Sequence, residues 1–419
     1  MTEGVPRLSN NDIIVSLDIG TSKIRVIIGE INSGSLNIIG VGTADSEGIK
    51  KGAIVDIDQT VQSIRNAVEH AERMVGITIN EIFVGISGNH IDLQSSHGVI
   101  AVSSDDKEIG TEDIDRVIQA ARVIALPPDR EIIDVVPKQF VVDGLNGIND
   151  PRGMIGVRLE VDATIITGSK TMIHNLSRTI EKANLNIAGF ILMPLAASQI
   201  ALSKDEKNLG VVLVDIGKGA TTISVFEQGL LVKTTVLPIG GEYITNDISI
   251  GLRTQMEVAE RVKLKFGMAS IEEANEEVLF KVSRIGSNVE KEFNQKELAY
   301  IIEPRVREMF QLIQQELHEL GFTKEIAGGF VLTGGVTAMN GILTIAQEEL
   351  KPSVRISVPD FIGVKDPSYT GGVGVILYAF KYFMKRHSGN STASASKAKR
   401  KVQKTNTMDR IKNWFSEFI

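Results

Sequence analysis

The sequence predicts an α/β fold in which two duplicated units, each with a mixed sheet, follow one another along the chain. The tripeptide Asp-Ile-Gly begins at Asp18 and again at Asp215, each time after an apolar, β-branched run that is typical of a buried strand. A glycine follows at a matching distance: Gly42 lies 24 residues after Asp18, and Gly240 lies 25 residues after Asp215. Repetition at this scale indicates two units derived from one ancestral unit.

Each Asp-Ile-Gly turn is suited to phosphate. Glycine lets the backbone approach oxygen atoms and direct N–H groups at them, and a carboxylate at the end of a strand can hold a hydrated Mg²⁺. One short glycine motif is weak evidence, because an ordinary hairpin turn explains most such matches. Two copies favour a pair of facing hairpins that clamp one polyphosphate.

The elements of the first unit follow in β-β-β-α-β order. A second strand is predicted over 24–29, after the Asp18 turn, and a later one over 81–87. Between them a helix over 57–75 is indicated by apolar residues at helical spacing, namely Val61, Ile64, Val68, Ala71 and Val75. We expect the first domain to comprise 12–84, 164–195 and 362–386.

Residues 85–163 depart from the repeat, which predicts a subdomain inserted into the first unit. We expect a strand near 98–102 and a helix over 111–125 that two prolines terminate. Ser169 is expected to cap a further helix, which runs to Ala183.

An apolar segment of small residues, 189–198, is expected to cross from the first unit to the second. A second strand again follows the Asp215 turn, over 222–226. The helices predicted after it span 241–252, 256–266 and 297–320, and Pro304 should bend the last of them. We expect the second domain to comprise 196–241 and 327–361, with 242–326 as its upper subdomain.

A short strand enters a glycine turn at 328–336, and a helix over 341–350 follows it. Gly334 and Gly335 expose backbone in this turn, which suits the flat face of a base or a ribose. The chain contains neither the G-x-G-x-x-G nor the G-x-x-x-x-G-K-[ST] pattern, so a Rossmann or P-loop site is excluded. The three turns together predict a nucleotide cleft between the two domains.

The end of the chain is predicted to lie on a membrane surface. After a last globular helix over 372–385, residues 387–407 lack core residues, which indicates a flexible basic linker. A helix over 408–419 would then place the apolar side chains on one face: Met408, Ile411, Trp414, Phe415, Phe418 and Ile419. Docking on its own domain is the alternative, but the aromatic face and the basic residues upstream favour a helix in the plane of an anionic bilayer.

Composition excludes several classes of function. The 419 residues include no cysteine, which excludes disulfides and cysteine nucleophiles, and the six histidines show no metal-ligand spacing. Residues 388–419 carry a net charge of +5, which leaves −12 for the remainder, and such an acidic body argues against a nucleic-acid binder. Because the sequence has neither an apolar run of about 18 residues nor a signal-peptide core, we expect a protein of the cytoplasm.

Two phosphate turns, a crossover segment and a Gly-Gly turn in this order resemble the actin, Hsp70 and sugar-kinase superfamily of ATPases over nearly the whole chain. Within that superfamily, Gly85-Ile86-Ser87-Gly88-Asn89-His90, the segment 238–248 and the terminal amphipathic helix resemble the FtsA family of bacterial cell-division proteins. The resemblance implies an actin-like ATPase fold in which 85–163 is an SHS2-like inserted subdomain.

The resemblance also implies a peripheral protein of the division site, on the cytoplasmic face of the cell membrane. Members of the family bind ATP with Mg²⁺, polymerise into filaments on the membrane and anchor filaments of the tubulin-like protein FtsZ to it during septum formation. The insert is implied to contact neighbouring protomers and later division proteins, and 242–326 to receive the FtsZ C-terminal tail. No nucleic-acid partner is implied.

Site residues follow from the same resemblance. It assigns nucleotide contacts to Gly20, Thr21, Ser22 and Lys23, to Gly217, Lys218 and Gly219, to Gly334, Gly335 and Val336, and to Glu260 and Lys263. It implies that Asp18 and Asp215 hold Mg²⁺ through water, with Asp215 the one possible catalytic residue. For Glu260 and Lys263 the alternative is an exposed ion pair on a helix.

One departure from the superfamily bears on catalysis. Met193 stands before Pro194, where ATP-hydrolysing relatives often carry a Glu that positions the attacking water, and a thioether cannot orient water by charge. At most slow ATP hydrolysis is therefore expected, with nucleotide acting mainly as a structural ligand. In a second departure, Val336 replaces the third glycine of the adenosine turn. A small-molecule kinase and an Hsp70-like ATPase of the same superfamily are the alternatives.

Overall fold

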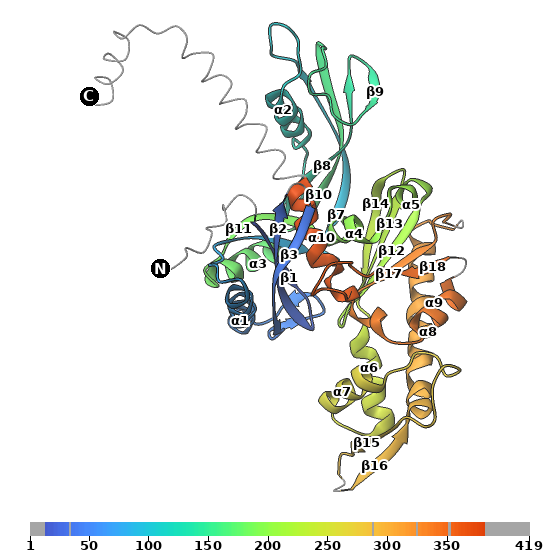
Figure 1. Ribbon diagram of the computed structural model, residues 1–419. Helices are drawn as coiled ribbons and strands as arrows, with labels where there is room; N and C mark the ends of the chain where they lie inside the picture. Colours follow the sequence, from blue (N-terminus) through green and yellow to red (C-terminus); the bar gives the residue numbers. More distant parts are fainter. Residues whose placement is uncertain (1–12, 33–34, 287–288, 324–325, 351–352, 382–419) are drawn as a thin grey trace, which may run out of the picture.

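The computed structural model describes residues 13–32, 35–286, 289–323, 326–350 and 353–381. Two five-stranded mixed sheets and the helices that cover them confirm the predicted α/β class (Figure 1). The predicted linker at 387–407 and the predicted terminal helix at 408–419 lie outside the described residues. Among the helices that are described, none is long and apolar enough to cross a membrane.

The first sheet has the order β11-β6-β1-β2-β3. The strands β1 to β3 run antiparallel to one another, whereas β6 runs parallel to β1 and β11 parallel to β6. Their bounds in chain order are Ile13–Ile19 (β1), Lys23–Asn32 (β2), Ser35–Asp45 (β3), Glu81–Ile86 (β6) and Asn186–Leu192 (β11).

The second sheet repeats this arrangement, with the order β14-β13-β12-β17-β18. Its first three strands are again antiparallel, and β17 and β18 continue the sheet in parallel. The bounds are Val211–Ile216 (β12), Thr221–Glu227 (β13), Leu230–Leu237 (β14), Phe330–Thr333 (β17) and Val354–Ile356 (β18). The shared strand order supports a duplication.

One detail of the predicted repeat is wrong, because the two matching glycines are not equivalent. Gly42 lies inside β3, where a Cβ would meet the Ala67 carbonyl oxygen at 1.9 Å, so it allows the helix α1 to pack on the strand. Gly240 instead lies directly before the helix α6. The similar spacings of 24 and 25 residues therefore come from two different packing constraints.

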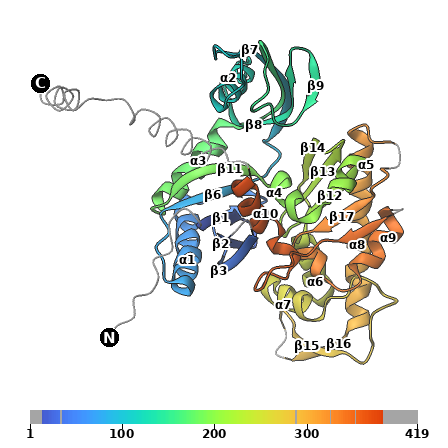
Figure 2. The same ribbon diagram turned by 45° about the horizontal axis from the view of Figure 1, so that its top comes forward.

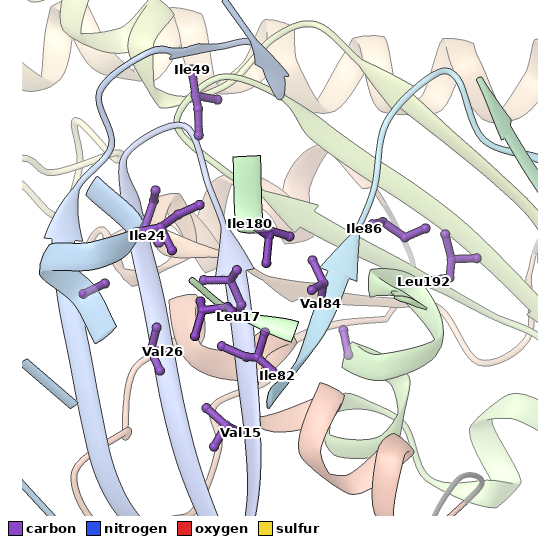
Figure 3. Packing of buried hydrophobic residues seen from close by; sticks show 14 of the residues in the cluster. Val15, Leu17, Ile24, Val26, Ile49, Ile82, Val84, Ile86, Ile180 and Leu192 are labelled. Carbon is purple, nitrogen blue, oxygen red and sulfur yellow. The ribbon is translucent and has the colours of Figure 1, made fainter. Parts of the chain in front are cut away.

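Two layers of helices enclose the first sheet. On one face lie α1 (Ile57–Val75) and α3 (Lys170–Lys182), which bury the apolar side chains of β1, β2 and β6 (Figure 3). On the other face lie α4 (Met193–Ala201) and α10 (Thr370–Ala379). Figures 1 and 2 show α4 and α10 between the two sheets.

The inserted subdomain is an antiparallel sheet, β7-β10-β8-β9, with one helix on it. Its elements are β7 (Asp92–Ala101), α2 (Thr111–Ala121), β8 (Arg130–Val142), β9 (Leu145–Ile148) and β10 (Arg158–Ser169). Because β6 belongs to the first sheet up to Ile86 and β10 reaches Ser169, the insert lies a few residues later than the predicted 85–163.

In this region the end predicted for one helix is wrong, and the cap predicted for another stands at Ser169 without a side-chain hydrogen bond. The helix α2 ends at Ala121 rather than at 125. Ser169 precedes α3, but its side chain makes no capping hydrogen bond, because the residue is still paired with Arg130 as the last residue of β10. Tertiary strand pairing thus replaces the local cap that the sequence favoured.

In the second domain α8 and α9 cover the face of the sheet opposite α4, whereas α5 lies on the α4 face. The strands β15 and β16 form a small hairpin at the far end of this domain (Figure 1). The bounds are Lys204–Leu209 (α5), Gly241–Leu252 (α6), Met256–Phe266 (α7), Leu279–Ser283 (β15), Glu290–Asn294 (β16), Gln295–Glu319 (α8) and Ile342–Leu350 (α9). The helix α8 continues through Pro304.

Candidate functional site

A cavity of about 590 Å³ lies between the two domains. Both Asp-Ile-Gly turns line it, together with α7 and the short 3₁₀ helix η1 (Gly335–Ala338). Every residue that the sequence assigned to nucleotide or to metal faces this one cavity: Asp18, Gly20, Thr21, Ser22, Lys23, Asp215, Gly217, Lys218, Gly219, Glu260, Lys263, Gly334, Gly335 and Val336. Residues that are far apart in the sequence are thus brought together, while their roles toward a ligand remain predictions.

The two turns share one backbone geometry. The Gly20 N–H donates to the Lys23 carbonyl oxygen at 3.1 Å, and the Gly217 N–H donates to that of Ala220 at 3.0 Å. Each bond closes a hairpin directly after the strand that carries the aspartate. The duplication therefore extends from the order of the strands to the hydrogen bonds of the turns.

The start of the helix α6 fixes the backbone of the second turn through two hydrogen bonds. The N–H groups of Gly241 and Glu242 donate to the carbonyl oxygens of Gly217 and Lys218, at 3.0 and 2.8 Å. In a trans peptide the C=O and the next N–H point in opposite directions, so the amides of Lys218 and Gly219 point away from α6. Both residues line the cavity, which places two N–H donors where an anion would lie.

The two turns contact each other across the cleft. A Cβ at Gly219 would lie 2.8 Å from Thr21 Oγ1 and 2.9 Å from Thr21 Cγ2, so only glycine fits at this position without displacement. The Thr21 hydroxyl also accepts a hydrogen bond from the Gly52 N–H, at 3.3 Å. Thr21 thereby joins the first turn to the second turn and to the hairpin of β4 (Ile49–Lys50) and β5 (Ala53–Ile54).

The two aspartates lie at the ends of β1 and β12 and influence each other electrostatically. Burial raises the pKa of Asp18, and the Arg25 guanidinium opposes that shift. Burial and the charge of Asp18 raise the pKa of Asp215 to about 6, again against the effect of Arg25. Two buried carboxylates that repel one another are stabilised by a cation between them.

These carboxylates fit Mg²⁺ better than a transition metal. The described part of the chain holds no cluster of three or more His, Asp or Glu side chains suited to a metal ion. Mg²⁺ is usually held by one or two carboxylates, with phosphate oxygens and water completing its shell. Asp18 and Asp215, beside two turns suited to phosphate, supply that donor set.

The Gly-Gly turn lines the cavity directly beside the Asp215 turn. Gly334 has φ of 91°, and a Cβ there would lie 2.3 Å from Asp215 Oδ1, so glycine is required for both backbone and space. Gly335 has room, since its nearest neighbour would be Ser368 Cβ at 3.6 Å. Val336 is buried and packs against Gly241, where it occupies the position of the expected third glycine.

Glu260 and Lys263 on α7 form a buried pair, so the alternative of an exposed pair is wrong. Only 6% of the Lys263 side chain is exposed, and its Nζ donates to Glu260 Oε2 at 2.7 Å, Thr245 Oγ1 at 2.7 Å and the Gly241 carbonyl oxygen at 3.0 Å. Burial lowers the pKa of Lys263, although Glu260 opposes this. Burial would raise the pKa of Glu260, but Lys263 and Thr245 lower it overall. The pair thus anchors α7 to the start of α6.

Met193 begins α4 and faces the cavity between two glycines. A Cβ at Gly85 would lie 2.3 Å from its sulfur, and one at Gly371 would lie 2.3 Å from its Cε. The two glycines therefore leave room for a long apolar side chain on this wall of the cleft. A thioether there neither accepts a proton nor positions water by charge.

Sequence reasoning missed several residues that line the cavity, of which Arg25 is the most notable. Arg25 is paired with Asp18 in the β1–β2 register, so both side chains lie on the same face of the sheet. The missed signal is a charged residue between Ile24 and Val26 in an otherwise apolar strand. Asp366 and Ser368 line the cavity as well.

Comparisons with known proteins agree with this architecture. A family model described as the cell division protein FtsA matches residues 212–374, and one described as the SHS2 domain inserted in FTSA matches 88–167. FtsA from Bacillus subtilis is 55% identical over 372 residues, which cover 89% of this chain and 84% of that protein. FtsA from Pseudomonas aeruginosa is 37% identical over 414 residues, which cover 97% and 98%.

Solved structures show the same fold at low sequence identity. A chain of a PilM–PilN type IV pilus biogenesis complex matches with a TM-score of 0.60 and 14% identity, over 87% of this chain and 98% of its own. MreB5 of Spiroplasma citri bound to ADP matches with a TM-score of 0.54 and 13% identity, over 90% and 98%. These likenesses show an actin-like fold.

Proposed function

This chain belongs to the family of the cell division protein FtsA, and on that premise we propose that it is an ATP-binding protein that polymerises at the cytoplasmic membrane. There it anchors FtsZ filaments through its C-terminal amphipathic helix and helps to recruit later division proteins. The observation that carries the proposal is the single cavity at which both duplicated turns, α7 and η1 meet. A polyphosphate clamped between two domains holds them in one closed arrangement, the form suited to assembly.

The nucleotide part of the proposal assigns a role to each wall of the cavity. The amides of the two turns hold phosphate oxygens, Asp18 and Asp215 hold Mg²⁺ through water, and Gly334 and Gly335 face the adenosine. A bound Mg²⁺ would neutralise phosphate charge. Solved structures of MreB5, which has the same fold, are bound to ADP and to AMPPNP, and we extend nucleotide binding to this chain from them.

Turnover is proposed to be slow. Met193 gives the cleft an apolar wall at the position from which a carboxylate would position water. Binding energy then serves to hold the two domains together rather than to speed a reaction, since only interactions made in the transition state accelerate chemistry.

The partner surfaces are assigned at the level of subdomains. The upper subdomain at 242–326 exposes large apolar side chains, among them Leu264, Leu279, Ile285 and Val289, which suit a peptide partner such as the FtsZ tail. The insert projects from the end of the first domain (Figure 2), where a neighbouring protomer or a later division protein could reach it.

Membrane attachment is proposed from the sequence of residues 408–419. A single helix of twelve residues binds a bilayer weakly, so polymerisation would strengthen attachment by presenting many copies at once. The basic linker at 387–407 would add attraction to anionic lipid.

Liposome sedimentation with ATP tests the proposal. The full chain should pellet with anionic vesicles and weakly with neutral ones, whereas a truncation ending at Arg386 should stay in the supernatant. Replacing Trp414 and Phe415 by Ala should release the protein, because these two aromatic side chains supply a large part of the apolar area that would enter the bilayer.

A matched control is the double variant Asn413→Ala and Ser416→Ala, which alters the polar face of the same helix and should leave pelleting unchanged. Equal pelleting of the full chain and of the truncation would refute the membrane role. The same result would not bear on the proposal that the cavity binds nucleotide.

A further inference from the structure

Arg25 is a cleft residue with no assigned role. It lies on β2 directly opposite Asp18, and only 16% of its side chain is exposed. Its guanidinium carbon is 5.1 Å from the centroid of the Tyr369 ring. This cation–π contact holds the guanidinium at the wall of the cavity.

The hydrogen-bonding capacity of this guanidinium is not used by the described protein. Its Nε is buried and has no hydrogen-bond partner among the described residues. Its nearest recorded carboxylate contact, from Nη1 to Asp18 Oδ2, is 4.0 Å long, beyond hydrogen-bond distance. A buried guanidinium without hydrogen-bond partners is costly, so an oxygen-rich group in the cavity would be favoured.

The position of Arg25 indicates which end of a bound nucleotide it would contact. Its charge acts on both Asp18 and Asp215, so it lies beside the two carboxylates expected to hold Mg²⁺. Of the residues expected to meet the nucleoside, Gly335 begins η1 and Gly334 is its N-cap, on a different segment from Arg25. Because metal-binding carboxylates serve the terminal phosphates in nucleotide sites, Arg25 would face the phosphate end of a bound nucleotide.

The charge balance agrees with this placement. Asp18 and Asp215 together carry one more negative charge than Arg25 neutralises, which opposes a phosphate beside them, although Lys23 and Lys218 of the two turns also line the cavity. A bound Mg²⁺ changes the sign to positive, and Arg25 then offers a planar set of N–H donors to an anion.

We propose that Arg25 binds the terminal phosphate of an Mg²⁺-bound nucleoside triphosphate and lets the cleft distinguish triphosphate from diphosphate. The inference rests on the proposed nucleotide binding and adds a specificity residue to it. Arg25 is not one of the predicted contacts.

Calorimetric titration of the full chain with ATP and with ADP, both in Mg²⁺, tests the role of Arg25. Arg25→Gln should weaken ATP binding by about tenfold to a hundredfold, the usual loss for a hydrogen-bonded charge. ADP binding should change by less than about threefold. Lys50→Gln is the matched control, since it removes an exposed positive charge from β4 near the cleft and should leave both affinities unchanged.

Arg25→Lys keeps the charge but loses the planar donor set, so its preference for ATP over ADP should be intermediate. If Arg25→Gln does not fold, as judged by its melting curve, the lysine variant decides the question. The role of Arg25 would be overturned if the folded variants kept the same ratio of ATP to ADP affinity. That result could come from two unchanged affinities or from an equal loss for both nucleotides. If the unmodified chain binds neither nucleotide, the proposed function itself fails.

Discussion

Three glycines around the cavity have different roles, which depend on what an added Cβ would meet. At Gly334 a positive φ and the Asp215 carboxylate exclude any other residue. At Gly219 the side chain of Thr21 leaves no room. At Gly335 the backbone is outside the left-handed region and the space is open. Substitution therefore damages the fold at the first site, the contact between turns at the second and only the ligand space at the third.

Gly335 provides the sharpest test at the scale of one residue. Gly335→Glu should abolish nucleotide binding, because the added carboxylate occupies the cavity and repels phosphate. Gly335→Ala should bind nucleotide nearly normally, since its methyl group has only ordinary contact with Ser368.

Binding by a fluorescent ATP analogue measures both variants, and their melting curves should match that of the unmodified chain. Binding by the Glu variant would refute the assignment of this turn to adenosine. Loss of binding in the Ala variant would show that the turn tolerates no side chain.

The duplicated hairpins are the element on which the site depends. Their strands occupy equivalent places in two sheets, so the aspartates and turns face each other only because the domains pack with α4 and α10 between the sheets. Thr21 and Gly219 are where the two turns touch. The separation of the turns should therefore determine how tightly a polyphosphate is held.

A double-mutant cycle tests that contact. Gly219→Ala should weaken ATP binding by about tenfold, because its methyl group pushes against Thr21 and separates the turns. Thr21→Ala removes Oγ1 and Cγ2, the atoms that the new methyl group would meet. The double variant should therefore lose less affinity for ATP than the sum of the two single variants. We expect a coupling of about 0.5 to 3 kcal/mol, and strictly additive losses would contradict the contact.

At the scale of the whole molecule, the cavity joins two domains with largely separate cores. A ligand held by both domains stabilises their closed arrangement. Asp18 raises the pKa of Asp215 across the cleft, so a bound cation would relieve the repulsion between the two carboxylates. Nucleotide and Mg²⁺ should therefore act together.

Thermal denaturation checks this coupling. Mg²⁺ and ATP at one hundred times the dissociation constant should add about 2.7 kcal/mol to the stability of the folded chain. Removing Mg²⁺ with EDTA should reverse most of this gain, because Asp18 and Asp215 then face phosphate without a cation between them. Asp215→Asn should reduce the sensitivity to EDTA. A rise in the melting temperature that EDTA leaves unchanged would exclude Mg²⁺ from the site.

The sequence by itself determined the elements and the repeat. The helices α1, α6 and α7 have the predicted bounds, because their periodicity and termini are local properties of the chain. The two turns were recognisable for the same reason, since a strand, an aspartate and a glycine lie within a few residues.

Only the tertiary structure decided what each side chain meets. Lys263 is buried because α6 packs beside α7, Ser169 remains in a strand because β8 pairs with it, and Gly42 serves a helix rather than a turn. Arg25 became a candidate only when its strand, its ring partner and the cavity were seen together. Whether a side chain is buried or lacks a hydrogen-bond partner depends on residues distant in the chain. A sequence pattern reflects only residues that are close together in the chain.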